Sequence, residues 1–173
     1  MLTSVPEPTK RLHFQRFTLA DAPFLLELLN SPGWLKYIGD RGVHNLAGAE
    51  GYIQERIFPA YQEKGCGPML AIRITDGVIL GNVGVYKRPG LELPDFGFAF
   101  LPQFHGQGYA YEASLSALAY AQQEGHQELL AITLPHNLPS LRLLKKLGFR
   151  QEGEVQIPND AETLQLLRWK APL

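Results

Sequence analysis

Two glycines two positions apart, Gly106 and Gly108, precede an alanine-rich segment in the stretch HGQGYAYEA, His105–Ala113. Glycine has no Cβ atom, so it allows left-handed backbone turns and close approach of a ligand. The first turn of a helix leaves backbone N–H groups without partners and carries positive potential, which suits a phosphate. The same residues would also serve as a plain turn before a tightly packed helix. This stretch alone leaves both interpretations open.

Two well-known phosphate-binding motifs are absent from the sequence. There is no G-x-x-x-x-G-K-[ST], which excludes a P-loop, and no third glycine at the spacing that a dinucleotide-binding fold requires. The glycines follow three short runs rich in β-branched and aromatic residues: MLAIRI, VILGNVGVY and DFGFAFL. With turn signals between them, these runs predict an antiparallel three-stranded meander.

The N-terminal part of the chain predicts one strand followed by two helical regions. The stretch RLHFQRF alternates as a strand does, and Thr18 with Asp21 three residues later marks a helix start. A second helical region follows Asn45. Pro59 is expected to kink or cut this region, because proline lacks the backbone N–H that a helix needs.

After the meander, the pattern predicts a helix over residues 108–124, a strand, a second helix and two final strands. The predicted order is β-α-α-β-β-β-α-β-α-β-β, a mixed α/β fold. No internal repeat or long linker divides the sequence. We therefore expect a single domain over residues 1–173.

Composition restricts the class of protein. A hydrophobic content of 45% and a charged content of 19% are typical of a soluble globular domain. The net charge of -1 offers no basic field for nucleic acid, and no apolar run reaches the roughly 20 residues that span a bilayer. The N-terminus lacks the pattern of a secretory signal, so we expect a cytoplasmic location.

Metal and thiol chemistry find little support in the sequence. The single cysteine, Cys66, permits no disulfide within the chain, and no activating group stands beside it to generate a thiolate. Apart from His105, the histidines show no spacing typical of metal ligands, so we expect no metal.

A second segment, HNLPSLRLLKKLGF over His136–Phe149, decides how the glycine turn is interpreted. GQGYAYEA followed about thirty residues later by N-x-x-S-x-x-L-L-x-K-L-G-F closely resembles the GNAT superfamily of acyl-CoA-dependent N-acyltransferases. The resemblance is nearest to its RimJ/RimL-like branch. RLHFQRFTLADAPFLLELL and DFGFAFLPQFHGQGYAYEA are similar to the same branch, so the resemblance covers most of the chain.

The resemblance implies a fold and a cofactor site. The fold is a largely antiparallel mixed sheet, splayed between strands 4 and 5 and flanked by about four helices. Acetyl-CoA is the implied acyl donor, with its pantetheine arm on the exposed edge of the fourth strand and its pyrophosphate on the amides of the turn. The implied cofactor-binding residues are Phe98, Phe100, Leu101, His105, Gly106, Gln107, Gly108, Tyr109, Ala110, Asn137 and Ser140.

Three positions depart from the family pattern. His105 stands where Gln or Arg is usual, so we expect a CoA affinity that is weaker or that varies with pH. Tyr111 replaces a small polar residue, and Leu144 occupies the position of the family's usual tyrosine.

Transfer to an amine requires a proton acceptor, because an amine with a pKa near 10 is mostly protonated at neutral pH. The resemblance favours Asp95, at the start of the central strand, with Glu92 second and an ordered water third. Asp95 could instead be an ordinary surface carboxylate. For the proton donor to the leaving sulfur, the resemblance indicates Ser140. Asn137 is also expected to cap the helix that follows it.

Two other groups allow alternative interpretations. Arg142, Lys145 and Lys146 could bind a phosphate, but on a helical wheel they mostly point away from Ser140 and complement the helix dipole. Trp34 and Tyr37 could form an apolar acceptor pocket or belong to the core.

The expected function is direct transfer of an acetyl group from acetyl-CoA to a primary amine, on a protein N-terminus or a small molecule. The alternative is a non-catalytic module that binds acyl-CoA as a sensor or scaffold, and a nucleotide-binding regulator is a weaker third. The expected partners are CoA and the amine, with no nucleic acid and no membrane, and the protein is expected to be a monomer or homodimer.

Overall fold

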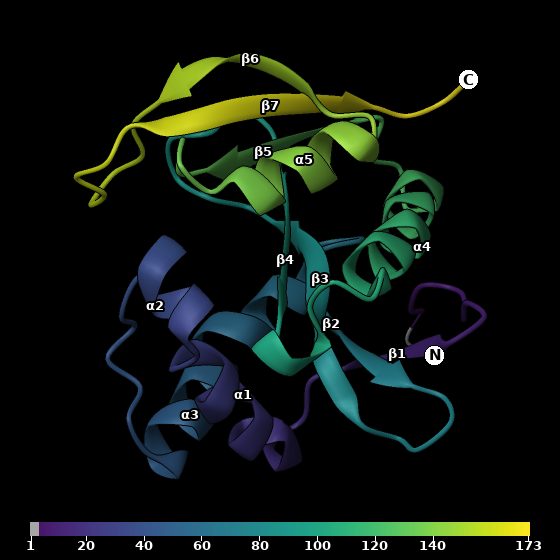
Figure 1. Cartoon of the computed structure of the whole chain (residues 1–173), viewed down its shortest axis with the longest axis vertical. Helices are drawn as coiled ribbons and strands as arrows, with labels where there is room; N and C mark the ends of the chain where they lie inside the picture. The colour runs from purple at the N-terminus through teal and green to yellow at the C-terminus, as the bar shows by residue number, and fades with distance from the viewer. Residues whose placement is uncertain (1–3) are drawn as a thin grey trace.

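The computed structural model describes residues 4–173, in which seven strands form one sheet with α-helices on both faces (Figure 1). The strands are β1 Leu12–Arg16, β2 Gly67–Arg73, β3 Ile79–Tyr86, β4 Asp95–Phe100, β5 Glu128–Thr133, β6 Arg150–Val155 and β7 Leu164–Lys170. The helices are α1 Ala22–Leu29, α2 Pro32–Tyr37, α3 Leu46–Tyr52, α4 Tyr109–Gln123 and α5 Leu138–Lys146.

The sheet is antiparallel except at its centre. Its strand order is β1-β2-β3-β4-β5-β7-β6, and β4 pairs with β5 in parallel. This pairing joins Asp95 to Leu130, whose N–H donates to the C=O of Pro94 at 2.9 Å. Within residues 4–173 that is the one register pair between these strands, so β4 and β5 diverge beyond it. The meander, the mixed sheet and the splay between the fourth and fifth strands are confirmed.

The core has two parts because side chains alternate between the faces of the sheet. On β2, Met69 belongs to the cluster under α4 and α5, whereas its neighbour Leu70 packs with α1 and α3. Ala113, Ala117 and Ala121 are buried along one side of α4. This small-residue stripe lets the helix pack closely against the sheet.

The helices differ from the prediction in one element. The six-residue helix α2 was not expected; it starts with a proline in its first turn, a position that proline tolerates well, and it is too short to show a periodic pattern. The flanking α-helices therefore number five within residues 4–173, against about four predicted.

Two local predictions about helix ends are confirmed. The N–H of Thr18 donates to the Asp21 carboxylate at 2.8 Å, and a short 3₁₀ turn then leads into α1. After α3 ends at Tyr52, a π turn and a 3₁₀ turn containing Pro59 continue the chain. The α-helix thus ends seven residues before Pro59, and Pro59 lies in the 3₁₀ turn that interrupts the helical region.

Candidate active site

A cavity of about 480 Å³ lies where β4 and β5 diverge. Its walls come from the end of α1, α2, the last residues of β4, the turn that follows, and the first turns of α4 and α5. The lining residues are Leu28, Ser31, Gly33, Trp34, Tyr37, Ile38, Phe98, Ala99, Phe100, Pro102, Phe104, His105, Gly106, Gly108, Tyr109, Ala110, Tyr111, Asn137, Pro139, Ser140 and Leu143.

The glycine turn has the backbone of an anion cradle. Gly106 and Gly108 have φ of 73° and 82°, in the left-handed region that favours glycine, and Gly108 is the N-cap of α4. The first helical hydrogen bond runs from Glu112 N–H to Gly108 C=O at 3.0 Å, so the N–H groups before it lack helical partners. A Cβ built on Gly106 would meet no atom within 4 Å, so the space over the turn is open. This arrangement fits a pyrophosphate.

The edge of β4 that faces the splay carries backbone groups for a ligand. The N–H of Leu101 donates to the C=O of Leu80 on β3 at 2.9 Å, so the peptide groups of Leu101 face β3. Alternate residues of a strand face opposite edges, so Phe98 and Phe100 turn their N–H and C=O groups toward the splay. Both line the cavity, whereas Leu101 is buried against the α1–α3 core.

His105 joins the turn to this strand edge. Its Nε2 lies 2.8 Å from the carbonyl oxygen of Phe100, and since a carbonyl can only accept, Nε2 carries the proton. The imidazole therefore donates to the strand whether it is neutral or protonated. The expected pH dependence of CoA affinity stays a prediction.

The start of α5 completes this side of the cavity. The Asn137 side-chain oxygen accepts from the N–H of Ser140 at 3.4 Å, which confirms Asn137 as the helix cap. Both residues line the cavity, opposite the β4 edge across the splay. Of the other predicted cofactor residues, Gln107 and Leu101 lie outside the lining.

The two candidate bases lie outside the lining as well. Asp95 is 1% exposed, and the Nε of Arg88 donates to its two carboxylate oxygens at 2.9 and 2.8 Å. Burial raises the pKa of Asp95, and the guanidinium of Arg88 offsets part of that rise. Glu92 is exposed and pairs with Arg168 at 2.6 Å. The structure thus brings Ser140 and the turn together, but neither carboxylate joins them in the cavity wall.

Comparison with known proteins identifies the family. Residues 11–150 match the model of the acetyltransferase (GNAT) domain. The chain belongs to the GNAT family of acetyltransferases. Over 150 residues it is 29% identical to an uncharacterized N-acetyltransferase, YnaD, of Bacillus subtilis strain 168, and the match covers 84% of this chain and 82% of that protein.

Solved structures share the GNAT fold. The acetyltransferase from Agrobacterium tumefaciens strain C58 has a TM-score of 0.81 at 20% identity, covering 99% of this chain and 97% of that one. A RimL ribosomal L7/L12 alpha-N-protein acetyltransferase in complex with coenzyme A has a TM-score of 0.79 at 16% identity, covering 96% and 98%. The GNAT family uses acetyl-CoA as its acyl donor, and the open turn and splayed strand edge of this chain fit that group.

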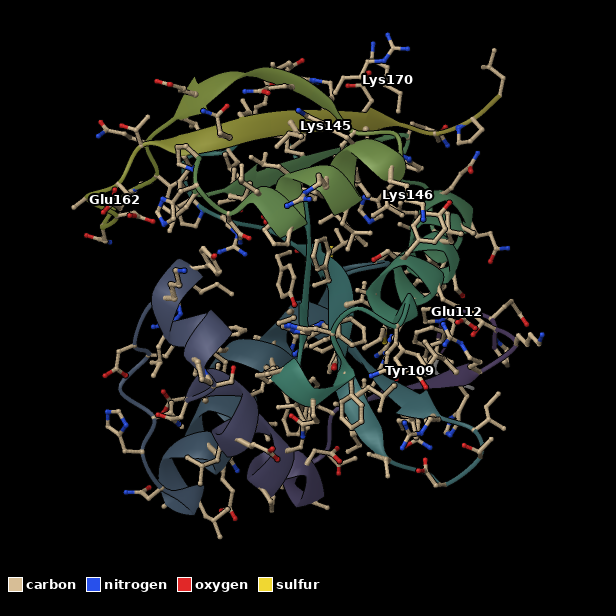
Figure 2. The ribbon with its side chains drawn as sticks, viewed as in Figure 1. Tyr109, Glu112, Lys145, Lys146, Glu162 and Lys170 are labelled. Atoms are coloured by element: carbon tan, nitrogen blue, oxygen red, sulfur yellow. The ribbon has the colours of Figure 1, made fainter. Side chains whose placement is uncertain are left out.

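The sequence did not predict the cation that lies beside the glycine turn, Arg11. Arg11, just before β1, donates to Gln107 C=O at 3.0 Å and to the Glu112 carboxylate at 2.6 Å, and it lies 4.1 Å from the centre of the Tyr109 ring. Figure 2 shows Tyr109 and Glu112 where α4 approaches β1. Partial burial acts to raise the pKa of the Glu112 carboxyl, but hydrogen bonds from Thr9 and Arg11 hold that pKa below its usual range. No sequence spacing signals this contact, because about a hundred residues separate its two sides.

The basic residues of α5 lie outside the cavity lining. Lys145 and Lys146 lie toward the C-terminal end of the helix (Figure 2), and Lys146 Nζ lies 4.0 Å from the centre of the Tyr111 ring. In the part of the chain that the structure describes, neither they nor Arg142 line the cavity. The helical-wheel interpretation of this cluster agrees with the structure.

Helix α2 supplies the wall of the cavity that faces the glycine turn. Trp34 and Tyr37 line the cavity, and Trp34 also packs against the α1–α3 core. The Tyr37 ring lies 5.7 Å from the ring of His136, between centroids, so α2 meets the start of α5. Trp34 therefore belongs to both the cavity wall and the core, and its part in an acceptor pocket stays a prediction.

The single cysteine lies outside the cavity wall. Cys66 is buried outside the cavity lining, and burial raises the pKa of its thiol. Residues 4–173 contain no group of three or more His, Cys, Asp or Glu side chains that could hold a metal ion, and no helix there is long and apolar enough to cross a bilayer.

Proposed function

We propose that this protein is an acetyl-CoA-dependent N-acetyltransferase that passes an acetyl group directly to a primary amine in a ternary complex. The observation that carries this proposal is the cavity in which the glycine turn, the free edge of β4 and Ser140 meet. The acceptor is a protein N-terminus or a small molecule. The proposal includes a cytoplasmic location, one domain over residues 1–173, and a monomer or homodimer.

We also propose that the chain belongs to the RimJ/RimL-like branch. A 58-residue segment is 36% identical to the ribosomal protein uS5-alanine N-acetyltransferase of Escherichia coli K12, although it covers only 30% of that protein. Mycobacterium smegmatis RimJ, solved with a CoA disulfide, has the same fold at a TM-score of 0.76 and 17% identity.

Acetyl-CoA supplies an acyl group already activated as a thioester, and the protein holds it in place. The free N–H groups of the turn and of the first residues of α4 bind the pyrophosphate. Phe98 and Phe100 offer backbone hydrogen bonds to the pantetheine arm, and Asn137 offers its side-chain amide from across the splay. Holding the amine and the thioester in line removes much of the entropic cost of their reaction.

Two side chains move protons in this proposal. Ser140 donates its hydroxyl proton to the sulfur as the sulfur leaves, and it regains a proton from the attacking nitrogen as the amide forms. Asp95 accepts the proton of the amine, and because it lies outside the cavity wall, the proton reaches it through an intervening water. The raised pKa of Asp95 makes it a stronger base than an ordinary carboxylate.

The function is tested by measuring free-thiol release from acetyl-CoA across a panel of primary amines. Release that depends on an amine is expected. Tight CoA binding with no release from any amine would favour the sensor or scaffold, and calorimetric binding of ATP or NAD in place of CoA would favour a nucleotide-binding regulator.

Ser140→Ala is expected to lower kcat about 10²-fold, because the leaving sulfur loses its proton donor. CoA affinity should stay near that of the unchanged protein, since the backbone cradle is intact. Steady-state kinetics and calorimetry measure the two quantities. Ser116→Ala, on α4 and outside the cavity lining, is the control. Equal kcat in the two variants would remove Ser140 from the mechanism.

Asn137→Asp separates capping from cofactor binding. Asp caps a helix as well as Asn does, so thermal stability should hold, but the amide donor is lost and a negative charge is added. We expect the Kd for CoA to rise about tenfold, the size of one lost hydrogen bond. Asn45→Asp is the control, because Asn45 caps α3 through Gly48 N–H at 2.7 Å, away from the cavity. An unchanged Kd in Asn137→Asp would leave Asn137 as a cap alone.

A further inference from the structure

The cavity has no charged anchor for a second cation of its substrate. Among the described residues that line it, none is Asp, Glu, Lys or Arg. Its imidazole, that of His105, lies at the turn and already donates to Phe100 C=O. Proteins normally bind polycationic amines with carboxylates. A buried ammonium without such a partner loses its hydration and gains no interaction in return.

The wall opposite the turn is apolar and aromatic. It consists of Leu28, Ser31, Gly33, Trp34, Tyr37 and Ile38. The hydroxyl of Ser31 donates to Leu28 C=O at 2.7 Å, and the buried indole N–H of Trp34 has no partner among the described residues, so the polar groups of this wall carry no negative charge. In the proposed function the cofactor occupies the β4 edge, the turn and α5, which leaves this wall for the acceptor.

The charges near this wall lie outside the cavity. Lys36 and Asp40, on and just after α2, are both exposed and outside the lining, and Lys36 Nζ lies 5.0 Å from the centre of the Tyr37 ring. Glu162, on the loop between β6 and β7, is also exposed and outside the lining (Figure 2). Neither carboxylate, Asp40 or Glu162, supplies a buried partner for a second ammonium.

We infer that the acceptor is a primary monoamine whose amine is carried by an apolar, preferably aromatic, group, and that polyamines and aminoglycosides are poor substrates. This inference rests on the proposed function. Burying an apolar group against Trp34, Tyr37 and Ile38 favours such an amine, while a second ammonium entering the same wall is penalised. Two kinds of molecule carry a single primary amine on an aromatic group: a free arylalkylamine and a peptide with an aromatic N-terminal residue.

The test compares kcat/KM for four acceptors: phenethylamine, a Phe-Gly-Gly peptide, spermidine and an aminoglycoside. At least one of the first two is expected to exceed both polycations by about 10²-fold or more, and which one does so identifies the source of the acceptor. A polycation used as well as or better than both monoamines would overturn the inference while leaving the acetyltransferase function intact. Acetylation of no amine would overturn both.

Variants of the wall sharpen the test. Trp34→Ala should lower kcat/KM for the preferred aromatic acceptor about 10- to 100-fold, in line with the loss of one buried aromatic side chain. Leu35→Ala is the control, because Leu35 is exposed on the same helix and outside the lining. Equal effects of the two changes would contradict the inference.

A second variant, designed to gain activity toward a polycation, keeps the inference testable if Trp34→Ala misfolds. Ile38 lines the cavity and is 44% exposed, so Ile38→Glu places a carboxylate in the wall without disturbing the core. We expect this variant to raise kcat/KM for spermidine and to lower it for the aromatic acceptor. No change in the ratio of the two would show that this wall does not select the substrate.

Discussion

Gly106→Ala is expected to raise the Kd for CoA by about tenfold or more, because the methyl group enters the open space over the turn where the pyrophosphate binds. Tenfold corresponds to about 1.4 kcal/mol. Alanine also adopts the left-handed φ of 73° poorly, which should reduce fold stability by about 1 kcal/mol. Calorimetric titration with CoA and thermal unfolding measure the two effects separately.

Gly77→Ala is a closely matched control for that change. Gly77 has the same φ of 73°, and a Cβ there also meets no atom within 4 Å, but it lies in the turn between β2 and β3. The two variants should therefore lose similar stability, and only Gly106→Ala should lose CoA affinity. If both bind CoA as the unchanged protein does, the turn is not the pyrophosphate site.

Asp95→Asn is expected to lower kcat about 10²-fold while leaving the Kd for CoA unchanged, because it removes the proposed proton acceptor and not the cradle. Activity should fall as pH drops below the pKa of Asp95, since the protonated carboxyl cannot accept a proton. The pH profile of kcat/KM measures this limb, which should be absent in the variant.

Arg88→Met tests whether Asp95 acts on the amine or only holds Arg88. Removing the guanidinium removes a charge that lowers the Asp95 pKa, so the acidic limb of kcat/KM should move to higher pH while most of kcat is kept. Equal loss of kcat in Arg88→Met and Asp95→Asn would mean that the ion pair, and not a base, matters. Glu92 or water would then be the acceptor to test.

The sequence was informative where local chemistry sets the structure. The left-handed turn at Gly106 and Gly108, the cap at Asn137 and the interruption at Pro59 each follow from the conformational limits of one residue type. The alternation that separates Met69 from Leu70 likewise follows from the pleat of a strand. These features place the turn and the start of α5 without knowledge of distant contacts.

The rest of the site depends on contacts between distant segments. Arg11 meets Glu112 only after β1 and α4 pack together, so nothing near Arg11 in the sequence identifies its role. Arg88 and Asp95 are seven residues apart, but they pair only where the chain folds back between β3 and β4. The short helix α2 lacks a period of its own, and its wall function arises from its position opposite the turn. The burial of Asp95 could not be predicted either, because a carboxylate after Pro94 has the local pattern of a surface residue.

The most direct test of the account is to incubate the protein with acetyl-CoA and primary amines, and to measure released thiol and N-acetylated amine together. Both products are expected in equal amounts, at a rate that depends on the amine and falls strongly in Gly106→Ala at limiting acetyl-CoA. Tight CoA binding without formation of any acetylated amine would contradict it and leave a protein that binds acyl-CoA without catalysis.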